Sequence, residues 1–440
     1  MKDSLQFHFD WEHPEGVRGP ELLATWASFR ITIDDACVTR VFDQSAKTIR
    51  DNIYVPLYPL AEWIVWNWWS LLDEPEVRAT REQRGFSARH NVRCVGDGIV
   101  MPDMEFLPLG EHVQIIWSPR KNPFQNVEFL NQGKKVVRRK ELFQVFFDFV
   151  QSVCARLEQE GVTGTWLQQG WGIVSTSIND PEEAAFCKVV AMLGKDPYAL
   201  ERSEEELVIK VAGMLPESLL EDCFLLSDWS HILKQAEHLR EDLGWIQHRP
   251  ENWERLKQVR DARNVVPVQT LPWDQGYDLA RHLRQNLGIP DDVPPSSYET
   301  IAKWLDIPVG QLANSIREET YGFPGMEALV ADNENGSPAF ILKEKGRPEN
   351  QIFSLCRGLC EYLVYPHTPR LVSSVNTEGQ KRNRAFAAEF LAPADAIKKR
   401  LVARDVSQED VDELACDMGV SPFVIQHQIM NHGLAVVGAE

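Results

Sequence analysis

Residues Gln351–Arg400, QIFSLCRGLCEYLVYPHTPRLVSSVNTEGQKRNRAFAAEFLAPADAIKKR, decide how the C-terminal part of the chain folds. Apolar residues recur every three or four positions from 352 to 365, which predicts one amphipathic helix. A second helix is predicted from 378 to 391, basic in its first half and apolar in its second, and Pro393 ends it. Glu389 falls in its most apolar part. That carboxylate needs a cation, a metal or an exposed edge, because burying it alone is very costly.

Two motifs in this stretch resemble those of ImmA/IrrE-type zinc peptidases. Residues Asn383–Pro393, NRAFAAEFLAP, are similar almost residue for residue to a family helix that reads A-N-R-F-A-A-E-L-L-M-P, and Glu389 stands where the family has its third metal ligand. Residues Phe353–Leu363, FSLCRGLCEYL, resemble the family's helix F-T-L-A-H-E-L-G-H-L-L with its chemistry replaced. The resemblance covers about residues 272–401 and implies a zincin-like domain.

The replaced residues decide the expectation about catalysis. A peptidase helix of this kind needs two His, at i and i+4, to bind zinc, and a Glu beside the first as general base. Aligned without a gap, the His positions hold Arg357 and Glu361, and the base position holds Gly358. Arg357 is a permanent cation, and an ion pair with Glu361 or Glu389 could occupy the space of the metal.

An alignment with a one-residue deletion gives a different set of candidate ligands. The His positions then hold Cys356 and Cys360, and Arg357 takes the position of the base. Thiolates at i and i+4 share a helix face, so Cys356, Cys360 and Glu389 could form an atypical zinc site. The other interpretation is that both Cys are small core residues. Neither alignment provides the base Glu, so hydrolysis by the family's mechanism is not expected.

The length and composition predict a multi-domain α+β protein. With 440 residues, 43% of them apolar, the chain is long enough for two or three domains. We expect a Trp-rich α+β domain over residues 1–160, a helical middle segment over 161–264 and an ImmA/IrrE-like peptidase-type domain over 265–440. The densest apolar segment, Tyr54–Pro75, predicts a buried helix over residues 60–72. Its four Trp could alternatively line a ligand pocket or a docking groove.

The charge and cysteine content limit the partners and the compartment. A formal net charge of -19 disfavours binding to nucleic acid and to anionic lipid. The basic run Lys134–Lys140, KKVVRRK, is expected to be an exposed strand and helix start, or else a contact for an acidic partner or an anion. The eight Cys are scattered, which is typical of a reduced, cytoplasmic protein. No apolar run approaches the 18 residues of a membrane span, and the polar N-terminus does not resemble a signal peptide.

Two further segments imitate helix-turn-helix units, Tyr298–Ile316 and Val411–Ile429. Their second helices carry almost no Lys or Arg, and the second of them contains Pro422, so helical packing within the domain is the expected role. DNA binding through Val411–Ile429 stays as an alternative.

These observations predict a non-catalytic regulatory or partner-binding protein without a cofactor. The resemblance implies a helix-turn-helix repressor as the protein partner, or another partner in stress response, mobile-element control or phage defence. Arg382 and Arg384 are the candidates for binding a partner or an anion. The alternatives are a zinc endopeptidase that cleaves such a repressor, and a DNA-binding regulator.

Overall fold

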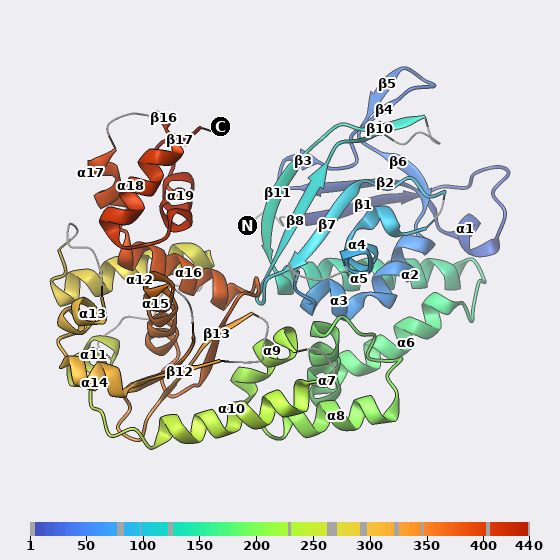
Figure 1. Ribbon diagram of the computed structural model, residues 1–440. Coiled ribbons are helices and arrows are strands. Elements are labelled where there is room, and N and C mark those ends of the chain that lie inside the picture. Colours follow the sequence, from blue (N-terminus) through green and yellow to red (C-terminus); the bar gives the residue numbers. More distant parts are fainter. Residues whose placement is uncertain are drawn as a thin grey trace. The chain divides into compact units, whose positions relative to one another are not determined.

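The chain folds into two compact units, Met1–Glu205 and Glu206–Glu440 (Figure 1). Each unit has its own apolar core. The computed structural model describes residues 5–76, 83–96, 98–121, 126–227, 230–261, 271–290, 297–320, 325–344, 347–401 and 405–438. Both units combine helices with small sheets, so the predicted multi-domain α+β class is confirmed. The predicted boundary between residues 264 and 265 lies outside the described residues. Helices of the expected middle segment occur in both units.

The first unit contains three sheets, with strand orders β1-β2-β3, β5-β4-β10-β9 and β11-β8-β7, and β6 also pairs with β2. Its strands are β1 (Leu5–Trp11), β2 (Trp26–Ile33), β3 (Ala36–Cys37), β4 (Val41–Asp43), β5 (Thr48–Arg50), β6 (Ile53–Pro56), β7 (Asp103–Pro108), β8 (His112–Ser118), β9 (Arg120–Lys121), β10 (Val127–Phe129) and β11 (Gly133–Arg138). Its helices are α1 (Pro20–Ala24), α2 (Tyr58–Trp66), α3 (Trp68–Asp73), α4 (Gln83–His90), the short 3-10 helix Val92–Cys94, α5 (Arg139–Gln159), α6 (Trp166–Asn179) and α7 (Pro181–Met192). Helix α8 (Arg202–Ala212) runs across the boundary between the units.

The Trp-rich segment forms two short helices at the centre of the first core. The single helix predicted over residues 60–72 is interrupted at Asn67, whose side chain donates to the carbonyl of Trp63 over 2.8 Å. Trp68 is 1% exposed and packs edge-on against Phe143, with the ring centroids 5.3 Å apart. Trp66, by contrast, is 48% exposed. Most of this segment therefore serves the core, as its dense apolar pattern predicts.

The second unit is built on one four-stranded sheet with the order β12-β14-β13-β15. Its strands are β12 (Ile316–Glu319), β13 (Met326–Asp332), β14 (Pro338–Lys343), β15 (Arg370–Ser373), β16 (Asp405–Val406) and β17 (Val436–Val437). Its helices are α9 (Glu217–Leu226), α10 (Ile232–Gln247), α11 (Glu254–Asp261), α12 (Pro272–Leu287), α13 (Tyr298–Leu305), α14 (Val309–Asn314), α15 (Pro348–Val364), α16 (Glu378–Leu391), α17 (Ala394–Arg400), α18 (Gln408–Met418) and α19 (Pro422–Asn431).

Helix α15 packs on strands β13, β14 and β15, and α16 packs between α15 and α12. Gly276 of α12 allows α12 and α16 to approach closely, because a Cβ added there would collide with the carbonyl oxygen of Arg382 in α16. The two helices expected from the stretch Gln351–Arg400 are thus both present, at the centre of the unit. Among the described residues, no helix is both long and apolar enough to cross a bilayer.

Candidate functional site

The candidate site lies where α15 faces α16 over the end of the small sheet. Arg357 and Glu361 are one helical turn apart on α15, and Gln380 and Asn383 are three residues apart on α16. Residues at i and i+3 or i+4 share one side of a helix, so each helix presents two polar side chains to the other. All four are buried, with exposed fractions of 2% or less.

Arg357 is the central residue of this cluster. Its Nε donates to Asn383 Oδ1 over 2.7 Å and its Nη1 to Glu327 Oε2 over 2.6 Å. Its Nη2 donates to the Ser373 carbonyl and to Gln380 Oε1, each over 2.7 Å. One guanidinium therefore links two helices with strands β13 and β15. These are charge-assisted bonds, which are stronger than bonds between neutral groups.

A second layer of hydrogen bonds surrounds the Arg357 contacts. The Asn383 amide donates to Glu361 Oε1 over 2.9 Å. The Gln380 amide donates to Asp222 of α9, 3.2 Å from Oδ2, and to the Leu371 carbonyl over 2.8 Å. The acceptors of the guanidinium are thus themselves held in place, as a buried polar network requires.

The charges within the cluster influence one another. Burial lowers the pKa of Arg357, and the nearby carboxylates of Glu327 and Glu361 oppose this effect. Arg stays protonated in proteins, so Arg357 is a cation here. Burial, together with Glu221 and Glu361, raises the pKa of Asp222 to about 7.

Gly358 lies on the side of α15 that faces the sheet. A Cβ added to it would be 3.0 Å from Cδ1 of the Phe340 ring and 3.7 Å from Cβ of Val330. The glycine allows the helix to approach the sheet closely. A Glu at this position would enter the apolar core rather than reach the polar cluster.

Cys356, Cys360 and Glu389 are the alternative candidate ligands. Cys356 and Cys360 are fully buried in the apolar core, and burial raises the pKa of the Cys356 thiol. Metal ligation requires the thiolate, which this environment disfavours. Within the described ranges, no three His, Cys, Asp or Glu side chains are arranged to hold a metal ion. Arg357 is a cation at one candidate position, and burial disfavours the thiolates at the other, so neither set of side chains favours zinc.

Glu389 has partners of its own, away from Arg357. Its Oε1 accepts from Arg281 Nε over 2.8 Å, and its Oε2 accepts from Gln428 Nε2 over 2.8 Å and from the Ala394 backbone N–H over 3.2 Å. These contacts satisfy the buried carboxylate that the sequence places in an apolar stretch. They also join α16 to α12 and α19.

The two Arg expected to bind a partner are used within the unit. Arg382 is 5% exposed and donates to the Tyr365 hydroxyl over 2.8 Å. Arg384 is half-buried and donates to the carbonyls of Val375 and Ser373 over 2.7 and 3.1 Å.

Both segments that imitate helix-turn-helix units are pairs of helices, α13–α14 and α18–α19. Pro422 is at the first turn of α19, where proline is well tolerated, so it is no obstacle to the helix. Gln428 of α19 is buried against α16, where it contacts Glu389. The pair α18–α19 is thus packed into the unit as expected.

Sequence reasoning identified Arg357 and Glu361 but missed Glu327, Gln380 and Asp222. Gln380 and Asn383 recur at i and i+3 in the basic half of a helix that is otherwise apolar, and this spacing was the available signal. Glu327 and Asp222 come from distant parts of the chain, and no local pattern relates them to α15.

The sequence matches no known protein-family model and no curated protein.

Proposed function

We propose that the chain is a non-catalytic, ImmA/IrrE-like regulatory protein that binds a protein partner. This proposal rests on Arg357, a buried cation whose guanidinium lies between α15 and α16 and makes four hydrogen bonds there. In the family that the sequence resembles, the facing sides of these two helices hold the zinc ion.

The electrostatics of the Arg357 cluster support a site that does not bind a metal ion. A zinc ion beside the Arg357 guanidinium would be repelled at short range, because the low-dielectric interior screens like charges poorly. Moving the guanidinium out would leave the buried Asn383 Oδ1 without its donor and would break the ion pair with Glu327, which is itself unfavourable.

The position of the missing general base supports the same conclusion. Gly358 touches Phe340 of the sheet, so this position faces away from the polar cluster. A peptidase of this type needs a carboxylate that reaches a metal-bound water. Neither a metal ligand set nor that base is provided by the residues at the site.

The surface of α18 and α19 supports a protein rather than DNA as partner. Residues 405–438 contain no Lys or Arg, while Glu409, Asp412 and Glu413 of α18 are exposed. Phe423 and Met430 of α19 are also exposed, at 66% and 60%. Phosphates would be repelled by such a surface, whereas a basic, partly apolar protein surface would be complementary to it. The family resemblance makes a helix-turn-helix repressor the first partner to try.

Zinc content tests the proposal. The purified protein is washed with chelator, given one equivalent of zinc, desalted and subjected to elemental analysis. We expect no retained zinc. A near-stoichiometric value would overturn the proposal and favour the zinc endopeptidase.

A variant with Arg357→His, Glu361→His and Gln380→Glu provides the matched comparison. Its third ligand is placed at 380 because Gln380 contacts Arg357, whereas Glu389, the position that the resemblance implies, contacts Arg281 and Gln428 instead. The variant keeps Gly358, because the sheet leaves no space for a larger residue there. If the facing sides of α15 and α16 correspond to the family's metal site, the variant binds zinc and the parent does not. A folded variant without zinc would contradict that correspondence.

A further inference from the structure

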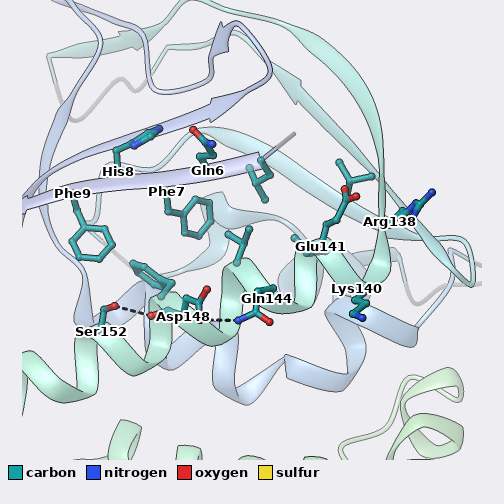
Figure 2. A pocket seen from close by; sticks show the side chains of 15 residues that line it. Gln6, Phe7, His8, Phe9, Arg138, Lys140, Glu141, Gln144, Asp148 and Ser152 are labelled. Carbon is teal, nitrogen blue, oxygen red and sulfur yellow. Dashed lines mark hydrogen bonds between the residues drawn. The ribbon is translucent and has the colours of Figure 1, made fainter. Parts of the chain in front are cut away.

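A groove in the first unit carries features that the proposed function does not use. It has a volume of about 690 Å³ and lies between β1, helix α5 and the end of β11 (Figure 2). Strand β1 forms one wall, and Figure 2 shows α5 running below it. The basic run Lys134–Lys140 borders the groove at Arg138 and Lys140.

The wall on the β1 side is a strand edge rather than a sheet face. Consecutive residues of β1, from Leu5 to Phe9, line the groove. A sheet face would contribute only every second residue, because side chains alternate along a strand. Among the described residues, β1 pairs with β2 alone, so its other edge is not covered by a neighbouring strand.

The pairing of β2 determines which backbone groups of β1 face the groove. Phe7 is opposite Ile31 of β2. The Ile31 carbonyl accepts from Val38 N over 2.9 Å, and Ile31 N–H donates to Thr39 Oγ1 over 3.1 Å, both on the side away from β1. The Phe7–Ile31 pair is therefore of the non-hydrogen-bonded kind, and the N–H and C=O of Phe7 point toward the groove. By alternation, those of Leu5 and Phe9 do so as well.

Helix α5 supplies an apolar floor with a polar rim. Phe149 is buried against Phe7, with ring centroids 5.3 Å apart, and half-buried Val145 precedes it by one turn. Gln144, Asp148 and Ser152 follow the open side at helical spacing, and Gln144 donates to Asp148 over 2.8 Å. A chain lying along β1 would cover Val145 and leave this rim in solvent.

The charges are distributed unevenly along the groove. Arg138 and Lys140 are exposed at the β11 end, together with Glu141, so that end carries one net positive charge. Asp148 is the other carboxylate of the lining and lies nearer the middle of α5. His8 points to the opposite face of the strand, where its ring is 3.2 Å from Thr32 Oγ1.

We propose that the groove binds an extended peptide segment of a partner protein as an additional strand on β1. The backbone of the segment pairs with Leu5, Phe7 and Phe9. Its apolar side chains, at alternate positions, face α5, where one of them packs on Val145. It carries a carboxylate at the end next to Arg138 and Lys140. Main-chain pairing provides the affinity in this mode of recognition, and the side-chain contacts provide the specificity.

The test uses an array of acetylated heptapeptides with Val at alternate positions and Glu, Lys or Thr at the others. The strongest binder is labelled, and its affinity for the full chain is measured by fluorescence anisotropy. We expect Glu to be selected at one end of the peptide. Two N-methylated copies, modified at the odd or at the even amides, distinguish backbone pairing from side-chain binding. Only one set of amides faces β1, so only one copy should bind at least about tenfold more weakly.

Protein variants locate the binding on the groove. Val145→Arg should abolish binding, whereas Ala155→Arg, at an exposed position elsewhere on α5, should not. Arg138→Glu combined with Lys140→Glu should remove the preference for Glu, and Lys121→Glu, at an exposed site on β9, should leave it.

Three results would overturn the proposal. They are an array without binders, equal binding of both N-methylated copies, and a dimer of the chain that Val145→Arg dissociates. The last would mean that a second copy of the chain, rather than a partner's peptide, covers the edge.

Discussion

Replacing Arg357 by Met gives the sharpest test of the cluster between α15 and α16. Met keeps much of the apolar stem of the side chain and removes the guanidinium. The substitution deletes four hydrogen bonds, including the ion pair with Glu327, and leaves Asn383 Oδ1 without its donor. Gln380 Oε1 and the Ser373 carbonyl keep other donors, the Ser373 N–H and Arg384. Removing one partner from a buried charged network costs about 3–5 kcal/mol. We expect a loss of this size in the free energy of unfolding of the second unit.

Buried thiols provide an assay that reports on the second unit alone. Cys356 and Cys360 lie on α15 in its core and become reactive only when that core opens. Pulse labelling across a urea series, read by mass spectrometry on the peptide that contains both, gives the unfolding midpoint of the unit.

The control is Arg255→Met, at a surface ion pair of the same unit. Arg255 donates to Asp306 over 2.9 Å, and the two side chains are 44% and 66% exposed. Such a pair contributes about 0–1 kcal/mol, because water screens it. If Arg357→Met shifted the midpoint no more than Arg255→Met, the guanidinium would not be holding the two helices together.

Three further predictions follow from burial and packing. The pKa of Asp222, at about 7, lies above that of an Asp in the unfolded chain. At a pH between these two pKa values the folded protein therefore holds a proton on Asp222 that the unfolded chain has released. The free energy of unfolding should therefore fall as pH rises toward 7, and urea midpoints from pH 5 to 8 should show a flatter dependence in Asp222→Asn. Gly358→Ala should destabilise the second unit by about 1–3 kcal/mol through overpacking against the sheet, whereas Gly244→Ala in α10, where nothing lies within 4 Å, should be neutral or stabilising in the same thiol assay. A thiol reagent under native conditions should label exposed Cys94 and Cys416 and leave the buried thiols unmodified, and early labelling on α15 would contradict the placement of that helix.

The elements with a strong apolar period could be predicted from the sequence. Helix α16 spans Glu378–Leu391 as the pattern and Pro393 indicate, and α15 extends the predicted helix N-terminally to Pro348. The alternating, β-branched pattern of residues 37–42 predicts a single strand, but the segment is divided into β3 and β4. Thr39 lies between them, and its hydroxyl donates to the Asp51 carbonyl over 2.7 Å. A bond across 12 residues is a tertiary contact that alternation along one strand does not reveal.

The candidate site was predictable only in part, for a related reason. Helical spacing places Arg357 and Glu361 on one face of the helix, but it does not show which buried groups form hydrogen bonds with these two side chains. Glu327 reaches Arg357 from β13, and Asp222 reaches Gln380 from α9. These partners depend on how the strands and helices pack, which no local pattern encodes. The same limit applies to Glu389, whose cation Arg281 lies 108 positions earlier.

The Arg357 cluster also bears on how easily a metal site could be restored. A guanidinium has five N–H donors in a fixed plane, and here it joins two helices and two strands much as a metal would join its ligands. Restoring one His at this position would remove those donors, and with them the bond to Asn383 Oδ1 and the ion pair with Glu327. A single Arg357→His change should therefore lose stability without gaining zinc, whereas changes on both helices together supply a set of ligands for the metal. Under the proposed function, several substitutions made together would be needed to give this chain catalytic activity. The partner protein is then recognised by surfaces outside the Arg357 cluster.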